Sequence, residues 1–219
     1  MEKNEYNNYY IELHNKRISH LITFLIKHVK SGSKIGIIGY SMFDAMIRDK
    51  LSDCTIYNIF PSVDFARQEV DLAANILVYD ITERKSVEKA YEYDCIIFTE
   101  VLEHLFSDDF LVINNVARLL RKSGFLFFSV PNVSALGKLI PIIVGENPYM
   151  KKSEIVEGAF GGFGHIREYS FREVRNLLMN DFRIIKLEGW NDYPNIFDKV
   201  AKLLPKIYAE TIFAFCQKL

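Results

Sequence analysis

The sequence predicts an α/β fold in which helices cover both faces of a doubly wound, mainly parallel sheet. Short runs of branched and aromatic apolar residues alternate with longer segments whose apolar residues recur at helical spacing. The short runs are apolar throughout, which is typical of parallel strands buried on both faces. With 219 residues, of which 49% are apolar, the chain is expected to form a single domain over 1–219.

Composition limits the classes of partner. Acids and bases nearly balance, with a formal charge of −1, so we expect a small-molecule partner rather than nucleic acid or an anionic membrane. The apolar stretches are too short to span a bilayer, and we see no signal peptide.

Cys54, Cys95 and Cys216 lack the paired spacing of zinc or redox sites, so we expect buried, reduced thiols and a cytoplasmic location. The sequence does not determine the oligomeric state.

The chain opens with a helical segment, 1–31. Within it, an amphipathic helix is expected over 10–29, because Ile18, Leu21, Leu25 and Val29 recur at helical spacing. Five strands are then expected, at 34–39, 55–60, 75–80, 95–100 and 125–130.

The helix expected over 107–122 has clear end signals. Ser107 is the expected N-cap, and Gly124 follows the helix. The charges suit the helix dipole, with acids in the first turn and bases in the last: Asp108, Asp109, Arg118, Arg121 and Lys122. Its buried stripe is expected to be Val112, Val116 and Leu119.

A second helix is expected from Ser170. Ser170 and Glu173 have the spacing of a capping box, and Tyr169 with Val174 has that of a hydrophobic staple. A strand at 182–190, a helix near 197–208 and a strand at 211–217 follow, which completes a seven-stranded sheet.

The segment 145–169 mixes glycines, aromatics and charges without periodicity. A loop of this length in a compact domain is usually a lid or a binding loop. Phe160, Phe163 and Tyr169 give it apolar anchors, so we expect a lid rather than a surface insertion.

The ends of the strands are where a ligand is expected, because doubly wound sheets bind ligands beyond the carboxyl ends of their strands. Two of these ends carry motifs, EVLEHL at 100–105 and Pro131 with Asn132, and GHIREYSFREVRNLL follows at 164–178. In these motifs the chain resembles the class I S-adenosylmethionine-dependent methyltransferases, in particular their small-molecule branch, from about Lys34 to the C-terminus. The resemblance implies a Rossmann-like sheet with an antiparallel last strand, S-adenosylmethionine as cofactor, and methyl transfer to a small molecule.

The resemblance also implies which residues bind the methyl donor. They lie at the ends of the first, second and fourth strands and at the adenine site after the third strand. The residues are Ile38, Gly39, Tyr40, Ser41, Phe60, Asp80, Ile81 and Glu100. The sequence departs from the family pattern where Ile37 replaces an acid, Ser41 and Phe43 replace glycines, and Phe60 replaces the acid that binds the ribose. Losing that acid is expected to weaken donor binding by about 1.5–3 kcal/mol.

On the acceptor side, His104 is the candidate base, because an imidazole with a pKa near neutrality can take a proton from a hydroxyl or amine. His165 and Tyr169 are its candidate partners in the lid. Surface polar roles stay open for these residues, and Glu103 is expected to satisfy backbone amides at a helix start. No metal site is expected.

Two hypotheses of different classes follow. The first is an S-adenosylmethionine-dependent methyltransferase with a modified donor pocket. The second is a methyltransferase-like domain that has lost donor binding and serves as an interaction or regulatory module, which the departures at Ile37, Ser41, Phe43 and Phe60 motivate. A nicotinamide dehydrogenase is disfavoured, because it leaves EVLEHL unexplained.

Overall fold

The computed structural model describes residues 15–39, 44–69, 75–84, 92–149, 164–191 and 205–219. Among them a seven-stranded sheet has the order β3-β2-β1-β4-β5-β7-β6. Its strands are β1 (Lys34–Ile38), β2 (Thr55–Phe60), β3 (Asn75–Val78), β4 (Tyr93–Thr99), β5 (Leu120–Pro131), β6 (Phe182–Trp190) and β7 (Thr211–Lys218). The helices are α2 (Asn15–His28), α3 (Asp44–Lys50), α4 (Val63–Glu69), η1 (Leu102–His104), α5 (Asp109–Leu119), α6 (Leu136–Ile143), α8 (Phe171–Leu178) and η3 (Lys206–Tyr208).

The strand directions confirm the predicted topology. β1 pairs in parallel with both β2 and β4, β2 with β3, and β4 with β5. β7 is antiparallel to both of its neighbours, β5 and β6. The strand order reverses at β1, which lies between β2 and β4, so the carboxyl ends of β1 and β4 form the switch point where such sheets bind ligands.

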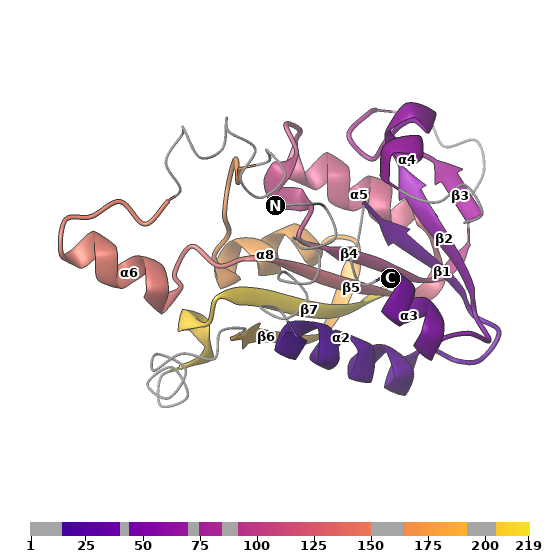
Figure 1. Ribbon diagram of the computed structural model, residues 1–219, viewed down its shortest axis with the longest axis horizontal. Coiled ribbons are helices and arrows are strands. Elements are labelled where there is room, and N and C mark those ends of the chain that lie inside the picture. Colours follow the sequence, from indigo (N-terminus) through magenta and orange to yellow (C-terminus); the bar gives the residue numbers. More distant parts are fainter. Residues whose placement is uncertain (1–14, 40–43, 70–74, 85–91, 150–163, 192–204) are drawn as a thin grey trace.

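Helices cover both faces of the sheet and divide the core into two clusters (Figure 1). α5 and α8 pack on one face, with the buried residues Val112, Val116, Leu119, Val174, Leu177 and Leu178. α2 and α3 pack on the other, with Ile18, Leu21, Leu25 and Ile47. Burying one such side chain contributes about 1.5–3 kcal/mol, so the apolar stripes hold the layers together.

The first helix is confirmed over its described part. α2 runs from Asn15 to His28, and the expected residues 10–14 lie outside the described residues. Phe24 packs edge-to-face on Phe213 and Phe127 of the sheet, at centroid distances of 5.5 and 5.8 Å. The helix is thereby fixed across β5 and β7.

The helix before β5 starts and ends differently from the prediction. Its N-cap is Asp108, whose carboxylate accepts from the Leu111 amide at 2.9 Å, whereas the Ser107 hydroxyl donates to the Thr82 carbonyl. The helix ends at Leu119, so Arg121 and Lys122 belong to β5 rather than to its last turn. The reason is tertiary, because Leu120 already pairs with Tyr93 of β4. The stripe of Val112, Val116 and Leu119 is buried as predicted.

The C-terminal elements match their sequence signals. The capping box of Ser170 and Glu173 is present, and Tyr169 and Val174 are buried in one core cluster, as a staple requires.

Cys95 and Cys216 are buried free thiols, but Cys54 is only half-buried. Of the helix expected near 197–208, the structure describes η3, and residues 192–204 lie outside it.

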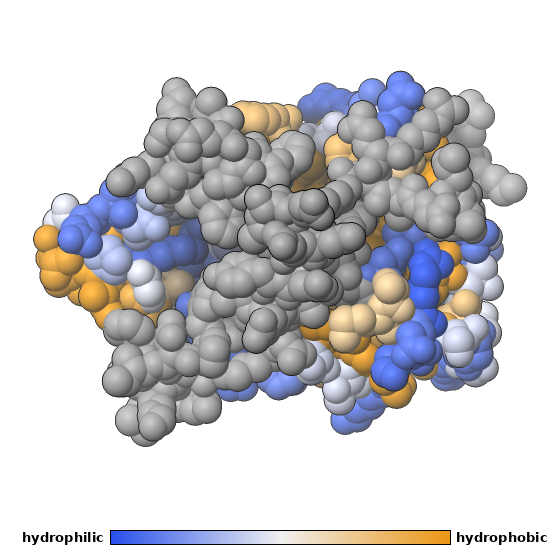
Figure 2. Space-filling view, in the orientation of Figure 1, coloured by the Kyte–Doolittle hydropathy of each residue, from blue (hydrophilic) through white to orange (hydrophobic). Residues whose placement is uncertain are grey.

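α6 projects from the body of the molecule at the left of Figure 1. Its end is apolar and exposed, with Ile142 at 52%, Ile143 at 81% and Val144 at 67% exposure, and it forms an orange patch at the left of Figure 2. α6 leads into the predicted lid, of which residues 150–163 lie outside the described ones. No described helix is long and apolar enough to cross a membrane.

Candidate functional site

The carboxyl ends of β1 and β4 meet at Gly39. Gly39 has a φ of +81°, and its amide donates to the Ile59 carbonyl at 3.2 Å. A Cβ added to Gly39 would lie 3.0 Å from Cγ2 of Val101, the second residue after β4. Any other residue here is strained by both its backbone and this contact. Gly39 therefore keeps the backbone close to the switch point.

Glu100 directly follows β4 and has a left-handed conformation, with a φ of 54°. Its Oε1 accepts from the Ser129 hydroxyl at 2.7 Å, and its Oε2 pairs with Nη1 of Arg17 at 2.9 Å. Its amide donates to the Ser129 carbonyl at 3.0 Å. A non-glycine residue at such a φ costs about 1–3 kcal/mol and persists only where its surroundings hold it. Here α2 and β5 hold the end of β4.

Glu103 lies in the turn η1 and is 1% exposed. Neither of its carboxylate oxygens has a hydrogen-bond partner in the part of the chain that the structure describes. Burial raises the pKa of Glu103 well above its usual range, the charge of Glu100 adds to this, and Arg17 opposes it. The expectation that Glu103 satisfies backbone amides is therefore wrong, because its side chain is turned into the interior.

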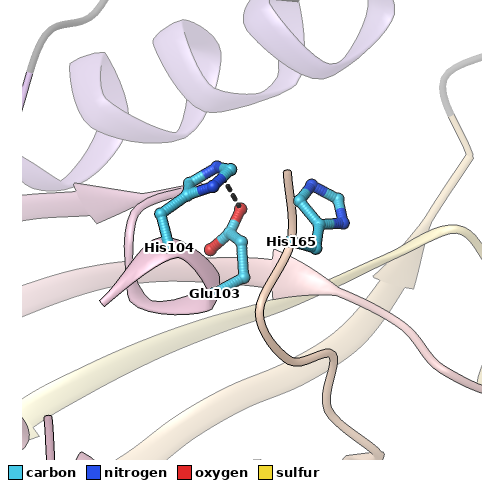
Figure 3. A group of neighbouring side chains, drawn as sticks. All are labelled: Glu103, His104 and His165. Carbon is cyan, nitrogen blue, oxygen red and sulfur yellow. Dashed lines mark ion pairs between the residues drawn. The ribbon is translucent and has the colours of Figure 1, made fainter. Parts of the chain in front are cut away.

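His104 and His165 lie beside the Glu103 carboxyl group (Figure 3). Nε2 of His104 is 3.8 Å from Oε1 of Glu103, and the centroids of the two imidazole rings are 5.2 Å apart. Nδ1 of His104 donates to the Gly164 carbonyl at 3.2 Å, since a carbonyl oxygen only accepts. Burial lowers the pKa of His104 and raises that of Glu103, so burial disfavours the charged forms of both groups.

His165 is oriented by a carboxylate. Its Nδ1 lies 2.9 Å from Oε1 of Glu168, whose other oxygen pairs with Lys138 of α6. Burial by itself would raise the pKa of Glu168, but hydrogen bonds from His165 and Lys138 hold it below its usual value. Glu168 is therefore ionised and fixes the ring of His165. His165 is itself partly exposed, with 38% of its side chain accessible.

Tyr169 holds the fold together at this edge. It is 1% exposed, and its hydroxyl donates to Oδ1 of Asp109 at 3.0 Å. Its backbone joins the segment after β5, with its amide bonded to the Pro131 carbonyl and its carbonyl to the Val133 amide. Burial raises the pKa of Tyr169, and the charge of Asp109 adds to this. The catalytic role stays a prediction, and these contacts favour a structural one.

Asn132 of the Pro-Asn motif is also structural. It is fully buried, and its amide nitrogen donates to the carbonyls of Ile207 and Ala209 at 2.8 and 2.6 Å. Its amide oxygen accepts from the Ser134 amide at 3.0 Å. The motif therefore ties the end of β5 to the segment before β7.

The loop after β3, where adenine was expected, is held by its own turn and by α5. Oδ1 of Asp80 accepts from the amide and hydroxyl of Thr82 at 2.8 and 2.6 Å. Asn115 of α5 donates to the carbonyls of Ile81 and Glu83 at 2.8 and 2.9 Å. Asp80 is half-buried and Ile81 is buried. The loop has a fixed shape, as a binding loop requires, and the adenine role stays a prediction.

The other predicted donor residues lie along the same edge. Ile38 is buried at the end of β1, and Phe60 at the end of β2 is 0% exposed and packs near Phe65. The Tyr79 amide donates to the Phe60 carbonyl, so the ends of β2 and β3 also meet. Tyr40, Ser41 and Phe43 lie outside the described residues.

The sequence did not indicate that Arg17, Lys138 and Glu168 contribute contacts to this site. It also did not indicate that the Glu103 carboxyl group lies beside both histidines. Glu168 carried a weak signal, because it follows His165 by three residues in a segment already expected to face the site. Arg17 and Lys138 carried none, since their partners lie far along the chain.

No protein-family model matches the sequence, and no curated protein matches it either. Solved structures do match in fold. A SAM-dependent methyltransferase from Archaeoglobus fulgidus has a TM-score of 0.59 at 13% identity, over 96% of this chain and 99% of that one. The N-methyltransferase NodS from Bradyrhizobium japonicum WM9, in complex with S-adenosyl-L-homocysteine, has a TM-score of 0.55 at 14% identity, over 94% and 87%. The chain therefore has the class I methyltransferase fold.

We expect Arg17→Met to lower the free energy of unfolding by about 3 kcal/mol, because it leaves the Glu100 carboxylate without its cation in a largely buried place. The exposed pair of Arg121 and Asp94 provides the control, and Arg121→Met should cost about 1 kcal/mol at most. Urea denaturation measures both. Adding Glu100→Gln to Arg17→Met should restore part of the loss, and equal losses in the two single variants would contradict this role for the pair.

Glu103→Gln tests the burial of the carboxyl group. Because the folded-state pKa of Glu103 is raised, the native protein binds more protons than the unfolded chain above the ordinary value of 4.5. The free energy of unfolding contributed by this group therefore falls as the pH rises from 4.5 to the folded-state pKa. The neutral variant escapes this loss, so its stability relative to the parent should grow between pH 5 and pH 8, by about 1–3 kcal/mol. Denaturation series in EDTA measure it, and a constant difference would show that Glu103 is not desolvated.

Proposed function

We propose that the chain binds S-adenosylmethionine at the carboxyl ends of β1 to β4 and transfers its methyl group to a small-molecule acceptor. The observation that supports it best is the class I methyltransferase fold together with the close approach of Gly39 to the end of β4. In this fold class the switch point is the expected ligand site.

The residues present fit the donor at the turn after β1. With a φ of +81° and no side chain, Gly39 lets the backbone approach a ligand that a Cβ would displace. The fixed loop at Asp80 and Ile81 offers an apolar wall beside a polar group for adenine. When bound, the donor supplies an electrophilic methyl group, and the chain supplies binding and orientation, which account for most of the acceleration in such a reaction.

The acceptor side is formed by the turn η1 and the segment 164–169. The neutral His104, whose proton is on Nδ1, carries its lone pair on Nε2 and can take a proton from a hydroxyl or an amine. His165 lies next to it and is partly exposed, which gives a small molecule access from solvent.

A second candidate function is an interaction module without donor binding. The burial of Phe60 favours it, because the end of β2 then offers no carboxylate to the two ribose hydroxyls. The two functions differ in one measurable property, which is affinity for the donor and its product.

Calorimetric titration with S-adenosylhomocysteine should show one binding site and raise the melting temperature with ligand concentration. Gly39→Ala should weaken this binding at least about tenfold, since the added methyl group contacts Val101 and takes up space beside the end of β1. Gly32→Ala is the matched control. Gly32 also has a positive φ, 77°, but it precedes β1, and among the described residues nothing lies within 4 Å of its Cβ position.

Both alanine variants should lose about 1 kcal/mol because both place alanine at a positive φ, and Gly39→Ala should lose somewhat more because its added methyl group also contacts Val101. A loss of affinity confined to Gly39→Ala supports the donor site. The absence of both heat and thermal shift at millimolar S-adenosylmethionine and S-adenosylhomocysteine would refute methyl transfer and leave the interaction module.

A further inference from the structure

We propose that Glu103, His104 and His165 bind a divalent first-row transition-metal ion, with Zn²⁺ as the preferred ion. Each of the three side chains offers one ligand atom, and these atoms lie within 4.8 Å of one another. Figure 3 shows the Glu103 carboxyl group lying between the two imidazole rings. Two residues come from the turn η1 and the third from the segment before α8.

The position of Glu103 is the second, independent observation. A carboxyl group that is 1% exposed normally has hydrogen-bond partners, because an unpartnered buried polar group costs about 1–3 kcal/mol. Glu103 has none for either oxygen among the described residues, and its carboxyl group faces two imidazoles. A bound cation would compensate this burial.

Both histidines are held as metal ligands usually are. A ligating imidazole commonly donates its second ring N–H to a carbonyl or a carboxylate, which fixes the ring and its tautomer. Nδ1 of His104 is bonded to the Gly164 carbonyl, and Nδ1 of His165 to the Glu168 carboxylate. In each ring the lone pair is then on Nε2. Lys138 in turn fixes Glu168 and anchors this support to α6.

The three ligand atoms must move closer together to bind a small ion. Ligands at about 2.0–2.1 Å from a tetrahedral Zn²⁺ lie about 3.3 Å apart. Nε2 of His104 and Oε1 of Glu103 are 3.8 Å apart, and all three ligand atoms lie within 4.8 Å of one another, so side-chain movements of about 0.5 to 1.5 Å bring them to this spacing.

The ligand set determines the class of ion. Two imidazoles and one carboxylate favour Zn²⁺ and its first-row neighbours, whereas Mg²⁺ and Ca²⁺ prefer oxygen ligands. Three protein ligands leave a coordination position open, as in catalytic zinc sites. The negative charges of Glu100 and Glu168 act on Glu103 and favour a cation, while Arg17 opposes it. The exposed side of His165 provides the entry path.

The ion would lie on the acceptor side of the domain. In this part of the inference, which rests on the proposed function, the open position takes an oxygen or nitrogen atom of the acceptor. A bound cation lowers the pKa of such a group, so in the metal-bound chain the acceptor would lose its proton to solvent and His104 would be a ligand, whereas its role as the base applies to the metal-free chain.

The test uses the full chain without a polyhistidine tag, stripped with EDTA and titrated with Zn²⁺ by calorimetry and with Co²⁺ by visible absorption. We expect one ion per chain and the absorption bands of Co²⁺ with nitrogen ligands. Glu103→Gln and His165→Ala should weaken binding about 100-fold or more, and Glu168→Gln about tenfold, as expected for a group that orients a ligand. Mg²⁺ should not compete at millimolar concentration.

His28→Ala is the matched control, because it removes an imidazole at the far end of α2, where Nδ1 contacts the Phe24 carbonyl. It should bind Zn²⁺ as the parent does. His165 is partly exposed, so His165→Ala should keep its fold, which circular dichroism checks.

Three results would overturn the proposed metal site. They are no Zn²⁺ binding, weak binding of more than one Zn²⁺ per chain without a tight site, and Zn²⁺ binding that survives in both Glu103→Gln and His165→Ala. Titration with S-adenosylhomocysteine separates this result from the proposed function. Product binding without metal binding overturns the metal site alone, and metal binding without product binding supports the metal site while removing its link to methyl transfer.

Discussion

The ion pair between Arg17 and Glu100 is the interaction on which the functional edge of the molecule depends. It joins the first described helix to the residue that follows β4, and Ser129 of β5 donates a hydrogen bond to the same carboxylate. Glu100 is in a left-handed conformation that only such contacts maintain. Because the turn η1 follows two residues later, its direction is set here. One largely buried charge pair thus links the core to the turn η1.

The turn η1 determines how Glu103 and His104 are placed. It buries Glu103 and presents His104, and the returning segment closes on it, with the Ile166 amide bonded to the Glu103 carbonyl. Tyr169 and Lys138 then fix that segment to α5 and α6. The η1 side of the edge is therefore polar and held by several contacts, whereas the other side rests on Gly39 and on a short loop that α5 holds.

The sequence predicted what depends on local pattern. The central strands, the apolar stripe of α5 and the capping box at Ser170 follow from spacing alone. The expectation of burial on both faces is wrong for β3, which lies at the edge of the sheet and has Asn75 and Val78 exposed. The sequence did not predict the end of α5, because the pairing of Leu120 with Tyr93 decides it. The sequence also did not predict that Glu103 is buried without a hydrogen-bond partner, because burial depends on tertiary packing. It did not predict the hydrogen bond between His104 and the Gly164 carbonyl, because the two residues are 60 positions apart. The predicted loop residues Tyr40 and Ser41 lie outside the described ones.

A crystal structure of the chain grown with S-adenosylhomocysteine tests the proposed donor site most directly. The ligand should lie across the carboxyl ends of β1 and β4, with its adenosine between Gly39 and the loop at Asp80 and Ile81. Its sulfur should point toward His104 and His165. Crystals grown at saturating ligand that show no density at this edge, or that show the ligand elsewhere, would contradict the donor site and the function built on it.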